Sequence, residues 1–565
     1  MKRRTFVLST LGPAALAACG GGGDTSEATA LSVEDGLETV RGRGGSASST
    51  IAAVRRAMRR AAAFMSEEVA YKGGYVWTYL PDLSRSWGEM EARRTMLWVQ
   101  PPGTPSMGHA YLDAYHATGD KLFLHAAEDV AKALIKAQHP AGGWNYIHDF
   151  AGEESLKEWY RTVGANGWRL EEFQHYYGNA TFDDAGTAVA SQFLLRMYLE
   201  RGSGRYREAV HRAIRFVTAS QYPVGGWPQR YPLRGNDYTE YVTFNDDVAG
   251  ENIKFLLMCH LALGQSRLLG NIHRAMESFL FMQQPDPQPG WALQHTLDGR
   301  PAAARTYEPL ALTTHTTANN ITQCMNFYTL TGDPQYLARV PQAIDWLDKV
   351  KFTPELAQKF GRSHPTFVEL GTDEPLYVHR RGSNVVNGEY YADKNPDRTI
   401  GHYSASRNVN IAALRSRYED LVSRPVDEVT AGSPLKVRRR TALPKYFSLR
   451  EVAVDDLFTG RMMTTPPVTE EAARAVAEAL VAPGYWPTPL TSTTNPYIGA
   501  GPSTPYLEDI YATTHVGDRY DTSPYNPESP PAGYPVVEAP LGISVDGFIR
   551  NMGTLVAYVA PVTQD

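Results

Sequence analysis

Two pairs of adjacent aspartates stand where a polar loop gives way to an apolar, helix-like segment. Asp183 and Asp184 occur in "NATFDDAGTAVASQFLL", and Asp246 and Asp247 follow Asn245 in "YVTFNDDVAGENIKFLL". Aspartate is a favoured helix N-cap, but one residue satisfies that need. Four carboxylates brought together would repel one another, and a hard cation such as Ca2+, which prefers oxygen ligands, would relieve that repulsion. The pattern leaves helix capping and a metal site both open.

An arginine and a glutamate stand three residues apart in "AAARTYEPL", just before the helical pattern of "TTANNITQCMNFY". Arg305 and Glu308 could form an ion pair at a helix start, which contributes little to stability. Alternatively, the acid could hold the guanidinium rigidly against an anionic substrate.

Three loops pair glycine with tryptophan: "GGWNYIHDF", "GGWPQRYPL" and "PGWALQHTLDG". Each Trp ring either fills the end of a helical hairpin as core or serves as a stacking platform for a sugar, and the core interpretation is favoured for the rings. Gln229 and Gln294 would supply hydrogen bonds beside such a platform. The candidate substrate contacts from these loops are Trp227, Gln229, Arg230 and His295.

The loops belong to an imperfect internal repeat. Each unit is a helical segment, a short Gly turn, a second helical segment and a Gly-Trp loop, as in "SQFLLRMYLERGSGRYREAVHRAIRFVTASQYPVGGWPQRYP". Ile272, Met276 and Phe279 fall on one stripe of a second helix. Repeated hairpins pack side by side as an open solenoid or a closed toroid. A closed ring would gather the loops at one end, where function concentrates.

Composition bears on the functional class and on the domain organisation. The 565 residues are 42% hydrophobic with a net charge of -6, so no nucleic-acid footprint is indicated. Cys259 and Cys324 lie in apolar helical contexts and are expected to be buried thiols rather than a disulfide framework. Residues 416–565 are rich in Pro and Tyr, and we expect them to pack over a helical domain of residues 51–415.

The first 19 residues read as an export signal. Lys2, Arg3 and Arg4 precede the apolar "FVLSTLGPAALAA", which is too short to span a bilayer. "RRTFVL" resembles a twin-arginine signal and "LAAC" resembles a lipobox, which implies lipidation of Cys19. Residues 20–50 are expected to form a flexible tether. The prediction is an exported protein, anchored to the bacterial envelope only through this lipid, and a monomer.

Three blocks together carry a family resemblance. "NATFDDAGTAVASQFLL", "QYPVGGWPQRYPLRGNDYTEYVTFNDDVAGENI" and "GWALQHTLDGRPAAARTYEPLAL" occur in this order and resemble the signature blocks of pectate lyases of polysaccharide lyase family ten, over about residues 51–415. The resemblance implies an all-α (α/α)3 toroid of helical hairpins, with long active-site loops and an irregular C-terminal extension.

The resemblance also implies a chemistry. The family cleaves polygalacturonate by β-elimination with calcium bridging enzyme and substrate, which makes an anionic polysaccharide the expected partner. Asp184 and Asp246 match the acids of the calcium site, and Arg305 matches the general base. The neighbouring Asp183 and Asp247 are further candidate metal ligands, and Asn245 is a candidate substrate contact. A cation on the uronate carboxylate would stabilise the charge that develops when the C5 proton leaves. Desolvation and that cation would both favour a neutral Arg305.

One departure from the family pattern concerns substrate binding. Where the family has "Pro-Leu-aromatic-x-Arg", this chain has "EPLYVHRR", which places His379 at the usual arginine position, and the later Gly-Arg-Asp-Gly motif is missing. Arg380 and Arg381 are the candidate substitutes. Another polyuronate or a decorated pectin therefore stays open as substrate. A non-catalytic glycan-binding lipoprotein and an inverting glycoside hydrolase, which needs two carboxyl groups about the bond, are the alternatives in other functional classes.

Overall fold

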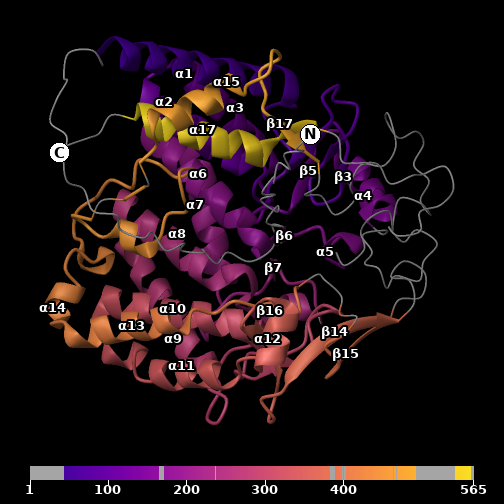
Figure 1. The fold of residues 1–565 in the computed structure, drawn as a ribbon, viewed down its shortest axis with the longest axis vertical. Helices are drawn as coiled ribbons and strands as arrows, with labels where there is room; N and C mark the ends of the chain where they lie inside the picture. Colours follow the sequence, from indigo (N-terminus) through magenta and orange to yellow (C-terminus); the bar gives the residue numbers. More distant parts are fainter. Residues whose placement is uncertain are drawn as a thin grey trace, which may run out of the picture.

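The computed structural model describes residues 44–164, 171–235, 237–381, 389–397, 399, 403–461, 463–465, 467–490 and 541–560 (Figure 1). The predicted signal peptide and Cys19 lie outside these ranges. Helix α1 (Gly44–Phe64) begins inside the segment expected to be a tether. Among the helices described, none combines the length and apolar character needed to cross a membrane.

Within the part of the chain that the structure describes, four helical hairpins follow one another. Their turns are closed by Gly119, Gly202, Gly264 and Gly332, each in the left-handed conformation at φ between 61° and 78° that favours glycine after a helix. The expected helix–Gly turn–helix repeat is therefore confirmed. The hairpins are α2 (Thr104–Thr118) with α3 (Lys121–Ala137), α6 (Gly186–Arg201) with α7 (Gly204–Ser220), α8 (Val248–Leu263) with α9 (Leu269–Met282), and α10 (Thr314–Thr331) with α11 (Val340–Lys349).

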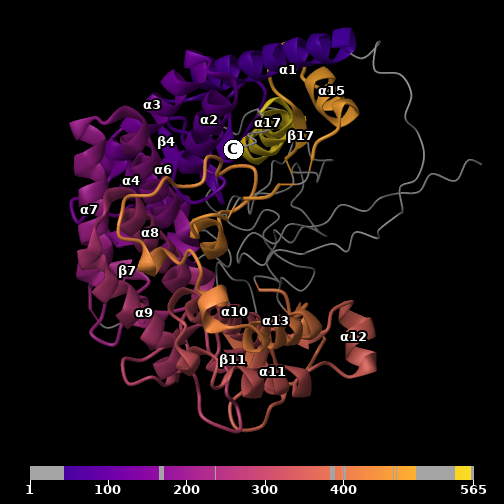
Figure 2. The ribbon, with the colours of Figure 1, turned by 90° about the vertical axis from the view of Figure 1, so that its left-hand side faces the viewer.

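The hairpins form a curved double layer. The first helices pack on one another, α2 on α6 and α6 on α8, and α13 (Ile411–Ser423) continues the array against α10 and α11. Figure 2 shows these helices following an arc, with the second helices on its outside. The first helices are buried on almost every side, whereas α3, α7 and α9 bury one stripe. The all-α toroid expected from the sequence is confirmed, and its array is longer than three hairpins.

The C-terminal part of the chain completes the array. Helix α17 (Val545–Val559) packs on α2 and α1, and α15 (Glu470–Glu478) covers α1 and α17. Strand β18 (Leu541–Ser544) lies between β17 (Pro487–Pro489) and β1 (Thr78–Tyr79) in a five-stranded antiparallel sheet. The described residues of the extension thus share one core with the hairpins.

Short strands and turns connect the hairpins at one end. The other strands are β2 (Ser86–Trp87), β3 (Glu91–Ala92), β4 (Met96–Trp98), β5 (Ile147–Asp149), β6 (Ala180–Thr181), β7 (Arg230–Tyr231), β8 (Val242–Thr243), β9 (Gln294–His295), β10 (Pro301–Ala302), β11 (Ala311–Thr313), β12 (His364–Pro365), β13 (Phe367–Glu369), β14 (Pro375–Arg381), β15 (Glu389–Asp393) and β16 (Ser406–Arg407). The short helices are η1 (Met65–Val69), α4 (Glu153–Thr162), α5 (Glu171–Gln174), η3 (Asp183–Ala185), η4 (Tyr238–Glu240), η5 (Asn245–Asp247), η6 (Ser266–Leu268), η7 (Pro334–Tyr336), α12 (Pro354–Phe360), α14 (Val426–Val429), η8 (Pro434–Lys436) and η9 (Val454–Leu457).

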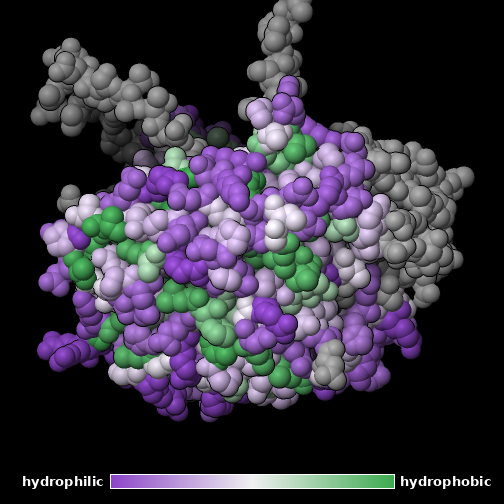
Figure 3. Space-filling model, turned by 90° about the horizontal axis from the view of Figure 1, so that it is seen from below, coloured by the Kyte–Doolittle hydropathy of each residue, from purple (hydrophilic) through white to green (hydrophobic). Residues whose placement is uncertain are grey.

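Cys259 and Cys324 are buried free thiols, as predicted. Hydrophilic residues cover most of the face at the α11 end of the molecule, and its apolar residues form small scattered groups (Figure 3).

Candidate active site

The two aspartate pairs occupy equivalent turns at the starts of α6 and α8. Asp184 and Ala185 in η3, and Asp246 and Asp247 in η5, all have φ between 51° and 55°. Neither turn caps its helix with a side chain, because Ala185 and Asp247 hold the N-cap positions without a side-chain hydrogen bond. The capping interpretation is therefore wrong. Two consecutive left-handed residues cost about 1 kcal/mol or more each, and such strain concentrates at functional sites.

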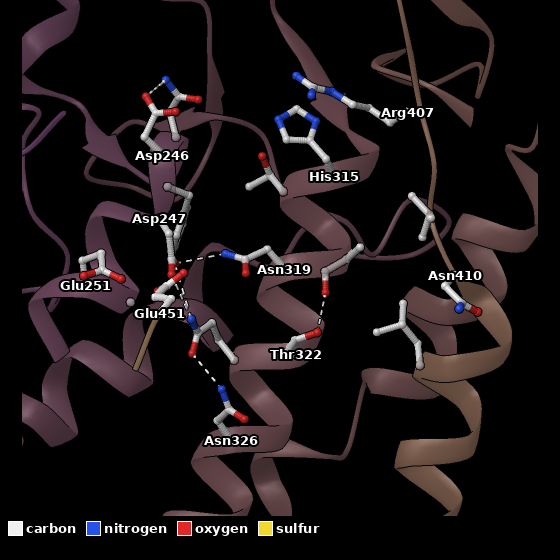
Figure 4. A pocket seen from close by; sticks show the side chains of 18 of the residues that line it. Asp246, Asp247, Glu251, His315, Asn319, Thr322, Asn326, Arg407, Asn410 and Glu451 are labelled. Carbon is white, nitrogen blue, oxygen red and sulfur yellow. Dashed lines mark hydrogen bonds between the residues drawn. The ribbon is translucent and has the colours of Figure 1, made fainter. Parts of the chain in front are cut away.

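Three of the four aspartates meet between the turns. Burial and the neighbouring Asp183 and Glu89 raise the pKa of Asp184 well above its usual range. Burial, Asp184 and Asp183 do the same to the pKa of Asp246. Asp247 points away from this group, and its carboxylate accepts from amides of α10 (Figure 4). The prediction that Asp247 belongs to the metal site is wrong for this reason.

Arg305 lies beside the acids and is only 3% exposed. Its Nη1 is 3.2 Å from Glu172 Oε2 and 3.5 Å from Asp183 Oδ2. Its Nη2 donates to Glu308 Oε1 at 3.0 Å and to the Tyr403 hydroxyl at 2.7 Å. The Arg305–Glu308 pair is thus a buried anchor rather than an exposed ion pair.

The protein groups around Arg305 favour its charged form. Burial by itself lowers the pKa of Arg305, but Glu308, Tyr307, Tyr403 and Glu172 together raise it well above its usual value. The Nε–H group finds no hydrogen-bond partner among the described residues. Burial alone therefore does not provide the neutral arginine that the sequence argument expected.

Several further side chains belong to the site but are not indicated by any pattern in the sequence. Gln100 Nε2 donates to Glu89 at 2.9 Å and to Asp184 at 2.8 Å, and so joins the acids. Burial, followed by Glu172, raises the pKa of Glu89 to about 8. The Tyr146 hydroxyl donates to Asp183 Oδ2. These residues come from separate loops, so no local spacing could have indicated them.

The tryptophans of the Gly-Trp loops are core residues. Trp144, Trp227 and Trp291 are 0% exposed. Each indole donates to a carbonyl of the preceding helix, at 2.8, 2.7 and 2.9 Å respectively. The core interpretation is confirmed, and the prediction that Trp227 contacts substrate is wrong because the ring has no exposed surface.

The burial of Trp227 leads to a mutational prediction. Trp227→Phe should lower the free energy of unfolding by roughly 1–3 kcal/mol, since the Val217 carbonyl loses its donor and the larger ring leaves a void. The KM of this variant for its substrate should stay within about twofold of the wild-type value. Chemical denaturation and steady-state kinetics measure the two effects, and a selective rise in KM would restore the platform interpretation.

The other candidate substrate contacts are buried side chains that pack around the site. His295 is 0% exposed and burial lowers its pKa to about 3, so the prediction of a substrate contact is wrong. Arg230 donates to Asn145 and Asn179, both at 3.2 Å, and its guanidinium lies over Tyr146. Because Arg230 is buried, it positions these neighbouring side chains and does not face solvent. Gln229 and Asn245 are each only 2% exposed, and Asn245 donates to Asp246 at 2.8 Å and to Tyr403 at 3.0 Å.

The unusual "HRR" stretch forms the end of strand β14. His379 is buried, stacks on Tyr391 and lies 2.9 Å from Asp393 Oδ1. The histidine that replaces the family's arginine is therefore a packed side chain. Arg380 and Arg381 pair with β15 through their backbones, but their side chains lie outside what the structure describes. Their role in substrate binding stays a prediction.

The acid group suits an oxygen-seeking cation. Asp183, Asp184 and Asp246 present carboxylates in a buried place, and Oδ1 of Asp183 lacks a hydrogen-bond partner among the described residues. Within the same ranges, no group of three or more His, Cys, Asp or Glu side chains is arranged to hold a metal ion by itself. The donor chemistry fits calcium, and further ligands would have to come from outside this group.

A cavity of about 740 Å3 adjoins the site. It is lined by α8, α10, the start of α13 and residues near 451–454, and Asn245, Asp246 and Tyr403 form part of its wall (Figure 4). The acid turn at Asp246 therefore opens onto a space large enough for a small-molecule ligand.

A model of the pectic acid lyase family matches residues 157–387. This segment is similar to that family. The pectic acid lyase segment contains both acid turns, Glu172 and Arg305, whereas Glu89, Gln100 and Tyr403 lie outside it.

Solved structures and curated proteins were also compared with the chain. It is similar to a family 10 polysaccharide lyase from Cellvibrio cellulosa, both as a mutant with trigalacturonic acid (18% identity, 51% of this chain and 89% of that one, TM-score 0.35) and without it (18%, 50% and 87%, 0.35). Cellobiose 2-epimerase from Bacillus thermoamylovorans is another such structure (11%, 67% and 100%, TM-score 0.32). No curated protein matches. The likeness to the pectic acid lyase family therefore rests on residues 157–387.

Proposed function

We propose that this protein is a calcium-dependent polysaccharide lyase that cleaves polygalacturonate, or a related polyuronate, by β-elimination. One observation carries the proposal: the pectic acid lyase segment brings Arg305 against Asp183, beside the acids Asp184 and Asp246. This combination supplies both a positioned nitrogen base and oxygen ligands for a cation.

The reaction requires a base and a way to hold the uronate. The base removes the proton from C5, the electron pair forms the C4–C5 double bond, and the C4–O bond breaks to release the leaving sugar. In this proposal Arg305 accepts the C5 proton, and Glu172, Glu308 and Tyr403 fix the plane of its guanidinium. Because Arg305 is buried and held charged, substrate binding must both open access to it and lower its pKa.

Asp184 and Asp246 would hold the calcium ion, and the fully buried Asp183 lies next to both of them. When bound, calcium would neutralise the uronate carboxylate and so lower the cost of the charge that develops at C5. Asn245 and Gln100 keep the two carboxylates oriented through their hydrogen bonds. The substrate's own carboxylate is the natural source of further ligands, since the described residues offer few.

The decisive experiment follows the unsaturated product. The protein is incubated with polygalacturonate and calcium while the ultraviolet absorbance of the C4–C5 double bond is recorded. Elimination predicts a rise that a chelator abolishes. Reducing ends without absorbance would instead identify a hydrolase, and binding with neither signal would identify a glycan-binding protein. Other polyuronates belong in the same panel, because the family arginine is replaced by His379.

Calcium should stabilise the protein more at pH 8 than at pH 5. The raised pKa values of Asp184 and Asp246 mean that their contribution to stability is complete below the unfolded pKa near 4 and is lost as pH rises through the folded pKa. A cation binds the ionised pair and offsets that loss. Thermal melting should show a calcium-induced rise on the order of 2 °C at pH 8 and less at pH 5. Asp184→Asn should remove the rise, and an equal shift at both pH values would contradict the assignment.

We further propose that the protein is exported and lipid-anchored through Cys19. The support is the basic and apolar leader that precedes "LAAC". Cys19→Ser should move the protein from the membrane fraction to the soluble fraction of a bacterial host, with Cys259→Ser as the control that leaves it in place. Retention of Cys19→Ser in the membrane fraction would exclude the anchor.

A further inference from the structure

Helix α10 carries a polar stripe that the proposed elimination does not use. His315, Asn319, Thr322 and Asn326 are spaced four, three and four residues apart, so they share one face of the helix. All four are partly exposed and line the cavity described above (Figure 4). A helix in the middle of a hydrophobic array normally presents apolar residues inward, so this stripe indicates a polar occupant.

The stripe is held in place by a hydrogen-bond network. Asn319 Nδ2 donates to Asp247 Oδ1 at 3.0 Å, and Gln323 Nε2 donates to Asp247 Oδ2 at 3.1 Å. Asn326 Nδ2 donates to Gln323 Oε1 at 3.2 Å. Gly250 makes the arrangement feasible, because a Cβ there would lie 2.4 Å from Asp247 and 2.5 Å from Gln323. The amides are therefore oriented before any ligand arrives.

Charges divide the cavity into two ends. Arg407 lies beside His315 in the upper part of the view, where Asp246 is also drawn (Figure 4), and Arg362 also lines the wall. Toward the other end are three carboxylates, those of Asp247, Glu251 and Glu451, and one ammonium. That ammonium, Lys254 Nζ, is already within 2.5 Å of Glu251 and 2.6 Å of Glu451.

This distribution disfavours a second uronate at the end lined by Asp247, Glu251 and Glu451, which we call the carboxylate end. A uronate carboxylate only accepts hydrogen bonds, and there it would face three carboxylates and a lysine that is already paired. Sugar hydroxyls both donate and accept. They match the Asp247 carboxylate, which accepts, and the amides of Asn319 and Asn326, which do both. The Thr322 hydroxyl donates to the Ala318 carbonyl at 3.0 Å and keeps lone pairs that accept from a sugar hydroxyl.

We propose that the carboxylate end of this cavity, with the adjoining Asn319 and Thr322, is a subsite for a neutral sugar residue, next to the uronate that undergoes elimination. The inference rests on the proposed lyase function, because Asp246 and Tyr403 belong both to the acid site and to the cavity wall. The preferred substrate is then a polymer in which uronate residues carry or alternate with neutral sugars, rather than a uniform polyuronate.

The test compares two matched hexasaccharides, one of galacturonate alone and one in which rhamnose is linked to O4 of each galacturonate. The double variant Asn319→Ala/Thr322→Val should lower kcat/KM for the mixed oligosaccharide about tenfold, because two neutral hydrogen bonds are lost. Its activity on hexagalacturonate should stay within about twofold of wild type. Thr322→Ser, which keeps the hydroxyl, should behave like wild type, and melting temperatures verify that both variants fold.

Calorimetric titration of both oligosaccharides in the presence of calcium separates this inference from the lyase proposal. Tighter binding of the mixed oligosaccharide, lost in the double variant, supports the subsite even if no elimination is detected, and then the lyase proposal alone fails. Two results would overturn the neutral subsite and leave the lyase proposal intact. One is elimination in which the double variant loses the same activity on both oligosaccharides. The other is tighter binding of hexagalacturonate than of the mixed oligosaccharide.

Discussion

Replacing Arg305 by lysine should reduce elimination of a polyuronate by about 100-fold or more. A positioned general base contributes roughly 10²–10⁴-fold. Lysine keeps one positive charge among Glu172, Glu308 and Asp183 but cannot reproduce the two-sided contacts of the guanidinium. The measurement is kcat from the ultraviolet absorbance of the product at saturating calcium, together with a melting temperature.

Lysine is a better probe than alanine at this position. Arg305→Ala would leave three buried carboxylates without their cation and should cost on the order of 3–5 kcal/mol of folding free energy, so loss of activity would be ambiguous. Arg300→Lys is the matched control, because Arg300 is an exposed arginine whose guanidinium pairs with the exposed Asp298. Arg305→Lys activity within threefold of wild type, in a folded protein, would exclude Arg305 as the base.

Replacing Asp113 by asparagine should destabilise the protein by about 3–5 kcal/mol. The Asp113 carboxylate is 0% exposed, and its Oδ1 accepts from Arg196 Nη2 at 2.6 Å. Its Oδ2 accepts from the backbone amides of Phe447 and Ser448 at 2.8 and 2.7 Å, which ties the C-terminal extension to α2 and α6. The NH2 group of an asparagine side chain would face N–H groups that also donate, so at least one of these hydrogen bonds would be lost. Arg196 would also remain buried without its counter-charge. Denaturant unfolding measures the loss.

The control for Asp113 lies in the same hairpin. Asp120 is the N-cap of α3 and accepts from Leu122 N, and asparagine caps as well as aspartate does. Asp120→Asn should therefore change stability by only about 0.5 kcal/mol. Limited proteolysis should cut Asp113→Asn near residues 445–448 first. Equal stability of the two variants would show that the extension is held by other contacts.

The sequence predicted the parts of the site that lie within local patterns. The Gly turns and apolar stripes indicated the hairpins, because both signals come from residues a few positions apart. Asp183, Asp184 and Asp246 were recognised as a surplus of charge at two helix starts. Arg305 was recognised through its block and its neighbour Glu308.

The remainder of the site depends on contacts that no spacing reveals. Glu89 and Gln100 reach Asp184 from the first loops, and Tyr403 reaches Arg305 from almost a hundred residues further along. Trp227 and His295 were misjudged because residue type suggested sugar contact while burial decided otherwise. Asp247 was grouped with its neighbour in sequence, but a second left-handed residue turns its side chain toward α10.

The packing of α17 on α2 has a consequence for folding kinetics. These helices touch although they are separated by about 430 residues of chain. Loop closure over such a separation is entropically costly, and contacts of high sequence separation slow folding. The hairpins α2–α3 to α10–α11 are built from local contacts, so we expect them to form first, with the apolar face of α2 exposed until α17 docks. The interval before docking is therefore when the chain is most prone to aggregation and proteolysis.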